Sequence, residues 1–161
     1  MIPAPITSAC QTLMLASRGR LHFRAGRIGE CFVDEDGHRF QVFRAVVVDA
    51  LPQQPQKPGA VFIPRFHVRG MPWRLNILFS WLPGLFIIGL PGFRSKCWMV
   101  DKTSGDFAGY YEWDTLEDAQ NYASSFAAGF MTRRSRPGSV SFRIFPVQQA
   151  PAAPARFGSV A

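Results

Sequence analysis

Three side chains able to move a proton fall in stretches of alternating, strand-like sequence. His67 lies in residues 60–69, Lys96 in residues 93–100 and Glu112 in residues 107–113. Histidine titrates nearest to neutral pH, and burial can move an amine or a carboxyl toward that range. His67 is therefore the first candidate for acid–base catalysis, with Lys96 and Glu112 as further catalytic candidates. The alternatives are a simply hydrogen-bonded His67 and an ion pair between Lys96 and Glu112 across a hairpin.

The same stretches carry side chains suited to a flat, electron-rich ligand. A cation can stabilise an enolate or phenolate oxygen, aromatic rings can stack on a planar molecule, and a tyrosine hydroxyl can donate to a carbonyl. The candidates for substrate binding are Arg65, Arg94, Trp98, Tyr110, Tyr111 and Trp113. For the aromatic residues among them, packing in the core is the common alternative.

Alternation along each strand assigns side chains to faces but leaves the register between strands open. Arg94, Lys96 and Trp98 share one side of their strand, and Tyr111 lies on the opposite side of its strand from Glu112. A bulge at Gly105 would decide whether Lys96 lies beside Tyr111 or on the Glu112 side.

The motifs of the common cofactor and hydrolase sites are missing from the sequence. It has no Gly-rich phosphate loop, no GxSxG elbow and no HExxH. Cys10, Cys31 and Cys97 are widely spaced and form no metal box, so we expect free thiols and a cytoplasmic protein. Only His67 could serve as an axial haem ligand, and nothing else supports haem. We predict no cofactor and no metal.

Charge and composition point toward a small-molecule or self-association role. The net charge is +7, but basic residues are scattered, and the cluster Arg133, Arg134 and Arg136 suits the end of a helix. Without a zinc-finger or RNP pattern, nucleic acid is not an expected partner. Charged residues make up 18% of the chain, below the typical value of about 25%. Some apolar surface is therefore expected to be buried in a second copy, as a homodimer.

Turn and linker signals divide the chain into four parts. We predict a flexible arm over residues 1–19, an N-terminal β-hairpin over 20–51 that docks on the main domain, and a disordered tail over 147–161. The Pro-rich residues 52–59 form a linker before the main domain, residues 60–146.

Within residues 60–146 the pattern alternates as β-α-β-β-α-β. The expected strands are 60–69, 93–100, 107–113 and 139–145, and the expected helices are 72–88, interrupted near 83–84, and 114–136. This order is the ferredoxin-like α+β motif, whose helices cover one face of a four-stranded sheet. The other face needs a cover, and a second sheet would supply it.

Residues 77–93 are the most apolar stretch of the chain. A membrane-spanning helix needs about 20 apolar residues, whereas this run is shorter and is broken by Pro83, Gly84 and Pro91. We predict no membrane span, but a buried helix and turn, with contact at a membrane surface as the alternative.

The middle of the main domain carries several short matches to one family. They are Pro91, Gly92, Phe93, Lys96, Trp98, Thr103, Gly105, Gly109, Tyr111, Trp113, Ala119 and Tyr122. Together they resemble the YdhR-like monooxygenases of the dimeric α+β barrel superfamily, which includes the antibiotic-biosynthesis monooxygenases. The resemblance covers roughly residues 60–146 of the chain. Ala108 departs from the family pattern, in which the first glycine of a Gly-Gly pair stands at this position.

The resemblance implies a ferredoxin-like dimeric barrel with a pocket beside each sheet. Several superfamily members oxidise polycyclic phenols with O2 and without flavin or metal, by binding, desolvating and helping to deprotonate the substrate. We therefore expect a cofactor-independent monooxygenase of secondary metabolism, acting on a hydrophobic aromatic or polyketide-like small molecule. The alternatives are a cyclase or isomerase in the same pocket, or a non-catalytic binding or assembly module.

Overall fold

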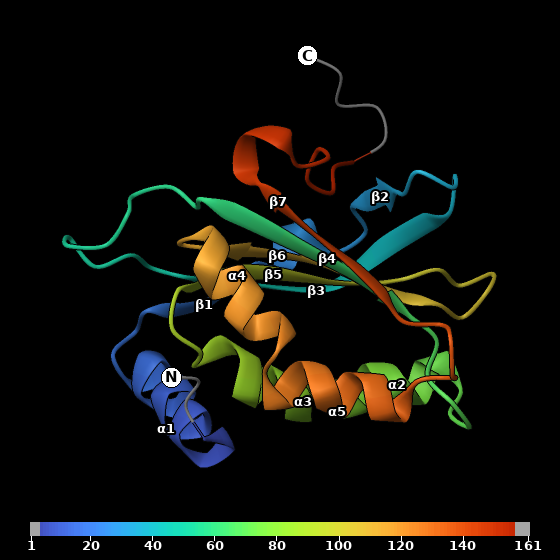
Figure 1. The fold of residues 1–161 in the computed structure, drawn as a ribbon, viewed down its shortest axis with the longest axis horizontal. Coiled ribbons are helices and arrows are strands. Elements are labelled where there is room, and N and C mark those ends of the chain that lie inside the picture. Colours follow the sequence, from blue (N-terminus) through green and yellow to red (C-terminus); the bar gives the residue numbers. More distant parts are fainter. Residues whose placement is uncertain (1–3, 157–161) are drawn as a thin grey trace.

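An antiparallel sheet of seven strands organises residues 4–156, the part of the chain that the computed structural model describes. The strand order is β1-β3-β5-β6-β4-β7, and β2 also pairs with β3. The strands are β1 (Leu21–Phe23), β2 (Cys31–Val33), β3 (Arg39–Val48), β4 (Ala60–Phe66), β5 (Phe93–Val100), β6 (Phe107–Trp113) and β7 (Ser141–Pro146). Figure 1 shows the sheet nearly edge-on, with most of the helices below it.

The helices form one layer against this sheet. They are α1 (Pro5–Ser17), α2 (Trp73–Phe79), α3 (Trp81–Ile88), α4 (Leu116–Ala123) and α5 (Phe126–Arg134), with short 3-10 turns η1 (Ala25–Arg27) and η2 (Val147–Gln149). From β4 to β7 the chain runs through the predicted β-α-β-β-α-β sequence, and these four strands are ordered β5-β6-β4-β7. The predicted ferredoxin-like α+β fold is therefore confirmed.

Strands from residues 20–51 widen the sheet. β3 pairs with β5 from Gln41 opposite Val100 to Val47 opposite Ser95, while β1 and β2 pair with opposite ends of β3. The first arm of the expected hairpin is thus two short strands, separated by the turn η1. As a result β5 becomes an interior strand, and all eight of its residues are buried.

The expectation of a flexible arm over residues 1–19 is wrong for residues 5–17, which form helix α1. This helix packs on α3, where the Thr12 hydroxyl donates a 2.6 Å hydrogen bond to Leu85 O and Ser8 donates to Phe86 O. Gly89 permits the close approach, because a Cβ there would lie 1.9 Å from Ser8 O. Residues 1–3 lie outside the described part of the chain.

The disordered tail predicted for residues 147–161 is also wrong, up to residue 156. Ala155 forms a β-bridge with Cys31, and Tyr110 and Arg27 donate 3.0 Å hydrogen bonds to Pro151 O and Pro154 O. Backbone carbonyls, which an Ala- and Pro-rich sequence still offers, hold this segment in place. Residues 157–161 lie outside the described residues.

The C-terminal segment and β2 cover the sheet on the side opposite the helices, which we call the outer face. Phe40, Val61 and Met99 on this face are at most 1% exposed, and Val147 and Ala150 pack against their cluster. The bare face that motivated the predicted homodimer is therefore covered by the chain itself. The homodimer stays a prediction.

Serine residues set the breaks between helices. The predicted helix 72–88 is interrupted at Ser80 and not at Pro83, which lies in the first turn of α3, where a missing N–H is tolerated. The predicted helix 114–136 divides at Ser124 and Ser125, and Ser125 Oγ caps α5 by accepting from Ala128 N. Among the described residues, no helix is long and apolar enough to cross a membrane.

Candidate active site

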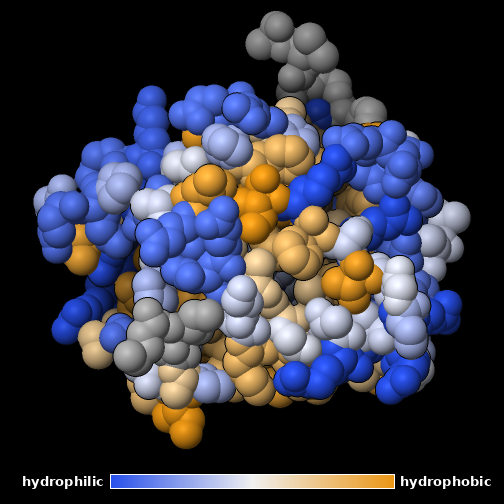
Figure 2. Space-filling view, viewed as in Figure 1, coloured by the Kyte–Doolittle hydropathy of each residue, from blue (hydrophilic) through white to orange (hydrophobic). Residues whose placement is uncertain are grey.

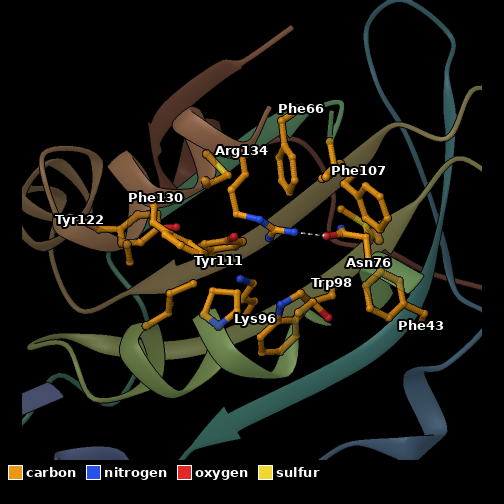
Figure 3. A pocket seen from close by; sticks show the side chains of 18 residues that line it. Phe43, Phe66, Asn76, Lys96, Trp98, Phe107, Tyr111, Tyr122, Phe130 and Arg134 are labelled. Carbon is orange, nitrogen blue, oxygen red and sulfur yellow. Dashed lines mark hydrogen bonds between the residues drawn. The ribbon is translucent and has the colours of Figure 1, made fainter. Parts of the chain in front are cut away.

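A pocket lined mainly by aromatic side chains lies between the sheet and helices α2, α3 and α5 (Figure 3). About 50 Å³ of it is open to the centres of water molecules, which is room for a few waters. Its aromatic lining consists of Phe43, Phe66, Trp98, Phe107, Tyr111, Tyr122 and Phe130. These rings reach one pocket because the strands present them on the helix face of the sheet.

Lys96 projects from β5 into this pocket. Its side chain is 3% exposed, and its Nζ lies 4.2 Å from the centre of the Trp98 ring and 4.1 Å from that of Tyr111. Burial lowers the pKa of Lys96 well below its usual value, and the nearby cation Arg44 lowers it further. No carboxylate within residues 4–156 forms an ion pair with Lys96. The amine is therefore held where its neutral form is favoured.

Arg44 on β3 supplies a fixed positive charge next to the pocket. Its guanidinium donates to Ser80 Oγ at 2.8 Å and to Ile77 O at 3.0 Å, and it lies 3.8 Å from the centre of the Trp81 ring. Burial lowers the pKa of Arg44 to about 10, so it remains charged at neutral pH. Its charge opposes protonation of Lys96, since like charges in a poorly solvated site repel.

Arg134 reaches into the pocket from α5, on the wall opposite Lys96 (Figure 3). Its guanidinium lies 3.8 Å from the centre of the Phe79 ring, and Nη2 is 3.4 Å from Asn76 Oδ1. Burial lowers the pKa of this half-buried arginine, although the guanidinium stays charged at physiological pH. The pocket thus places a fixed cation across from a lysine amine.

Two tyrosine hydroxyls complete the polar lining. Burial raises the pKa of Tyr111 well above its usual value, and Tyr122 raises it further. Burial also raises the pKa of Tyr122. Both phenols therefore stay protonated, and a hydrogen bond links their hydroxyls.

The structure brings together only three of the nine sequence-predicted site residues. Lys96, Trp98 and Tyr111 line the pocket, because Lys96 pairs with Tyr111 across β5 and β6. The bulge that fixes this register lies at Arg94 and not at Gly105. It shifts Glu112 opposite Ser95, and thus to the outer face.

Two of the predicted catalytic residues have structural partners elsewhere. His67 Nδ1 lies 2.7 Å from Asp106 Oδ1, and Arg65 bonds the other oxygen of Asp106 at 2.9 Å. Glu112 accepts a hydrogen bond from Ser95 Oγ. His67, Arg65 and Glu112 therefore do not share the pocket of Lys96.

The remaining predicted binding residues serve the fold. Arg94 forms an ion pair with Asp114 at 3.0 Å, and Tyr110 holds the C-terminal segment through Pro151. Trp113 is fully buried and stacks on Tyr122 with a ring separation of 5.1 Å. Core packing, the alternative given for the aromatic residues, holds for Trp113, whereas the alternative ion pair between Lys96 and Glu112 is not formed.

Sequence reasoning missed Arg134, Asn76 and Arg44. Arg134 does lie in the last turn of α5, as the sequence predicts. Its side chain lines the pocket, which the sequence does not predict. A signal for Arg44 was present, since it is a charged residue within a ten-residue run of mostly apolar strand sequence. Asn76 is likewise the one uncharged polar residue of helix α2, which is otherwise apolar except for Arg74.

Comparison with solved structures places this architecture among known ones. A monooxygenase-like protein from Listeria innocua matches with a TM-score of 0.51 and 14% identity. The match covers 70% of this chain and 65% of that protein. The heme-degrading enzyme LmHde from Listeria monocytogenes matches with a TM-score of 0.51 and 12% identity, over 78% of this chain and 96% of that one. An anthrone oxidase-like protein matches with a TM-score of 0.50 and 15% identity, over 68% of this chain and 54% of that one.

The chain shares its ferredoxin-like fold with these solved proteins. This is the fold that the resemblance to the YdhR-like monooxygenases implies, so the prediction drawn from short motifs is confirmed. No protein-family model matches the chain, and no curated protein matches its sequence. At these identities the likeness concerns the fold, and the chemistry has to be argued from the pocket.

Proposed function

We propose that the protein is a small cofactor-independent enzyme that removes a proton from a hydrophobic aromatic molecule bound beside Lys96. The observation that carries the proposal is Lys96 itself, a buried amine with a lowered pKa and no carboxylate partner among the described residues. A structural lysine would ordinarily point its charge into water or pair it, because burying an unpaired charge is unfavourable. A neutral amine in an aromatic pocket is suited to act as a base.

Each part of the pocket takes a role in this reaction. Trp98, Tyr111 and Phe130 can hold a planar substrate by stacking, and Lys96 Nζ would accept its proton. Arg134 would stabilise the oxyanion that forms as the proton leaves, since its charge persists in a site with little water. The ammonium formed on Lys96 then adds a second positive charge beside the substrate anion.

Oxygenation is the reaction class that we propose to follow. A methylene between aromatic rings would lose one proton to Lys96, and the carbanion would combine with O2. The resulting hydroperoxide would eliminate water and leave a carbonyl, so that one oxygen atom enters the product and the other leaves as water with both methylene hydrogens. The fold shared with a monooxygenase-like and an anthrone oxidase-like protein supports this choice. Cyclisation or isomerisation would begin with the same proton transfer.

Substrate entry would require the pocket to widen. Its present volume admits only a few waters, and drug-sized ligands occupy pockets of roughly 300–1,000 Å³. Arg134 is the side chain best placed to move, because it is half-buried and its contact to Asn76 is long, at 3.4 Å. We propose that its displacement by the substrate opens the site.

The proposal is tested by O2 consumption without added flavin or metal, using a panel of phenols and anthrone-type tricyclic ketones. We expect uptake with at least one tricyclic ketone, one O2 for each carbonyl formed, and a rate at least 100-fold lower in Lys96→Met. Lys57→Met, which removes an exposed lysine, is the matched control and should keep the full rate. Proton exchange into the substrate without O2 uptake would instead indicate an isomerase or cyclase. No change in any substrate would leave a binding module and refute the enzyme proposal.

A further inference from the structure

Within residues 4–156, four of the five helices contain no acidic residue. All 11 Asp and Glu residues lie within two stretches, residues 30–49 and residues 101–118. None occurs in residues 1–29, 50–100 or 119–161. Helices α1, α2, α3 and α5 all fall in the stretches without acid. Of the five helices only α4, which carries Glu117 and Asp118 in its first turn, contains carboxylates.

The same four helices expose large apolar side chains. Leu78 is 66% exposed, Leu75 52% and Trp81 49%. The surface that we call the helical surface comprises Leu13 of α1, Leu75 and Leu78 of α2, and Trp81, Leu82 and Leu85 of α3. Its helices adjoin one another, because α1 packs on α3 and α3 follows α2 after one residue. Monomeric proteins rarely leave an apolar patch of this kind without a partner.

Exposed arginines occur on these helices and next to them. Arg18, Arg24, Arg74 and Arg133 are exposed, and within residues 4–156 none of them pairs with a carboxylate. Arg24 follows Phe23, whose ring lies 5.5 Å from that of Trp81. In Figure 2 the lower margin, formed by these helices in Figure 1, shows apolar residues interspersed with hydrophilic ones.

We propose that the helical surface docks on an anionic lipid bilayer. Leucine and tryptophan side chains would enter the boundary between headgroups and acyl chains, and the arginines would lie at the level of the lipid phosphates. This combination of apolar and cationic residues in helices is what an interfacial site requires. The docking is independent of the chemistry in the pocket, although α2, α3 and α5 also wall that pocket and would hold it beside the lipid.

Charge and shape argue against the other occupants. In a symmetric dimer through this surface, the unpaired arginines of both copies would be brought together, and like charges in contact destabilise. A folded acidic protein would need recesses for its own side chains. The aromatic pocket beneath α2 and α3 does not supply one. It is lined by Asn76, Ser80 and Ile87 of this segment, and the exposed leucines do not line it. A fluid bilayer adapts to projecting side chains and needs no such recess.

Vesicle flotation of the full-length chain tests the proposal. We expect binding to phosphatidylcholine vesicles that contain about one-third phosphatidylserine, weak binding to pure phosphatidylcholine, and weaker binding as salt rises. Leu78→Ser with Leu82→Ser should lower affinity about tenfold, and Arg74→Gln or Arg133→Gln about fivefold each. Circular dichroism would confirm that each variant is folded.

Two control variants separate docking from general effects. Val33→Ser changes an apolar residue of similar exposure, 48%, on β2, and Lys102→Gln removes an exposed cation at the acidic end of the molecule. Both should bind like the unmodified chain. The proposal is overturned by an absence of binding to the anionic vesicles, by controls that weaken binding as strongly, or by full binding of the double serine variant. A dimer in solution that the double serine variant abolishes, without vesicle binding, would assign the surface to a second copy.

Discussion

Lys96 lies directly opposite Tyr111 in the paired strands β5 and β6, and its amine is 4.1 Å from the centre of the Tyr111 ring. An aromatic face attracts a cation but gives it no hydrogen-bond acceptor as strong as a carboxylate. Burying the lysine at this position therefore lowers the stability of the fold. This relationship leads to the first prediction.

Replacing Lys96 by Met should stabilise the protein at neutral pH by about 1–3 kcal/mol, because a buried ionisable group is exchanged for an apolar one of similar length. The folded-state pKa of Lys96 lies below its unfolded value. The unfolded chain therefore binds more protons between these two values, and the stability of the unmodified protein rises with pH there. Urea unfolding at pH 6, 7.5 and 9 should show the advantage of the variant shrinking as pH rises. An advantage that is constant across this range would contradict a lowered pKa.

Arg134→Met should lower kcat about 100-fold on a substrate found by O2 uptake, with a much smaller change in KM. Loss of a charge that matters only as the oxyanion forms affects the transition state more than the bound ground state. Arg133→Met is a matched control, because Arg133 is the exposed neighbour on the same helix. Equal losses in the two variants would show that Arg134 has no role at the reacting atoms.

Asp106→Asn should destabilise the protein at neutral pH and flatten its acid unfolding. Burial alone would raise the pKa of Asp106, but the hydrogen bonds from His67 and Arg65 outweigh it and lower that pKa. A carboxylate with a lowered folded-state pKa adds stability above its unfolded pKa, and that stability is lost as pH falls through the folded value. Thermal melts between pH 2.5 and pH 7 would measure the difference. Asp36→Asn is the control and should change the profile far less, because this carboxylate is 77% exposed and its ion pair with Arg65 is longer, at 3.5 Å.

Tyr110→Phe should destabilise the protein by about 1 kcal/mol, since it removes the 3.0 Å hydrogen bond to Pro151 O while keeping the ring. Increased hydrogen exchange in residues 150–156 should accompany the loss, as the C-terminal segment loses one of its anchors. Exchange that rises uniformly over the whole chain would show that the bond contributes to global stability alone.

The fold could be predicted because its signals are local. The alternation in residues 107–113 and the turn at 102–105 were enough to place β5 and β6 side by side, and Thr115 caps α4 by accepting from Asp118 N as its position suggests. The predictions fail for residues 5–17 and 147–156, whose structure depends on a few contacts with residues far along the chain. Thr12 and Pro151 are held by single hydrogen bonds to residues far along the chain, which no local pattern encodes.

The candidate site was predictable only in part for the same reason. Faces were assigned correctly to Lys96 and Tyr111, but the bulge at Arg94 brings them together, and this register is a property of the paired strands. His67 is the residue type most often used for proton transfer, yet Asp106 at 2.7 Å gives it a structural partner away from the pocket. Arg134 reaches the pocket from α5, a separate helix that Ser125 caps. The sequence predicts one helix over residues 114–136 and gives no sign of this break.

Every wall of the aromatic pocket comes from one polypeptide, from β3 through α5. The part of the site that these walls form is therefore assembled in the step that folds the chain. Turnover per molecule should then be the same in nanomolar and micromolar solutions, so that dilution is no means of switching this protein off.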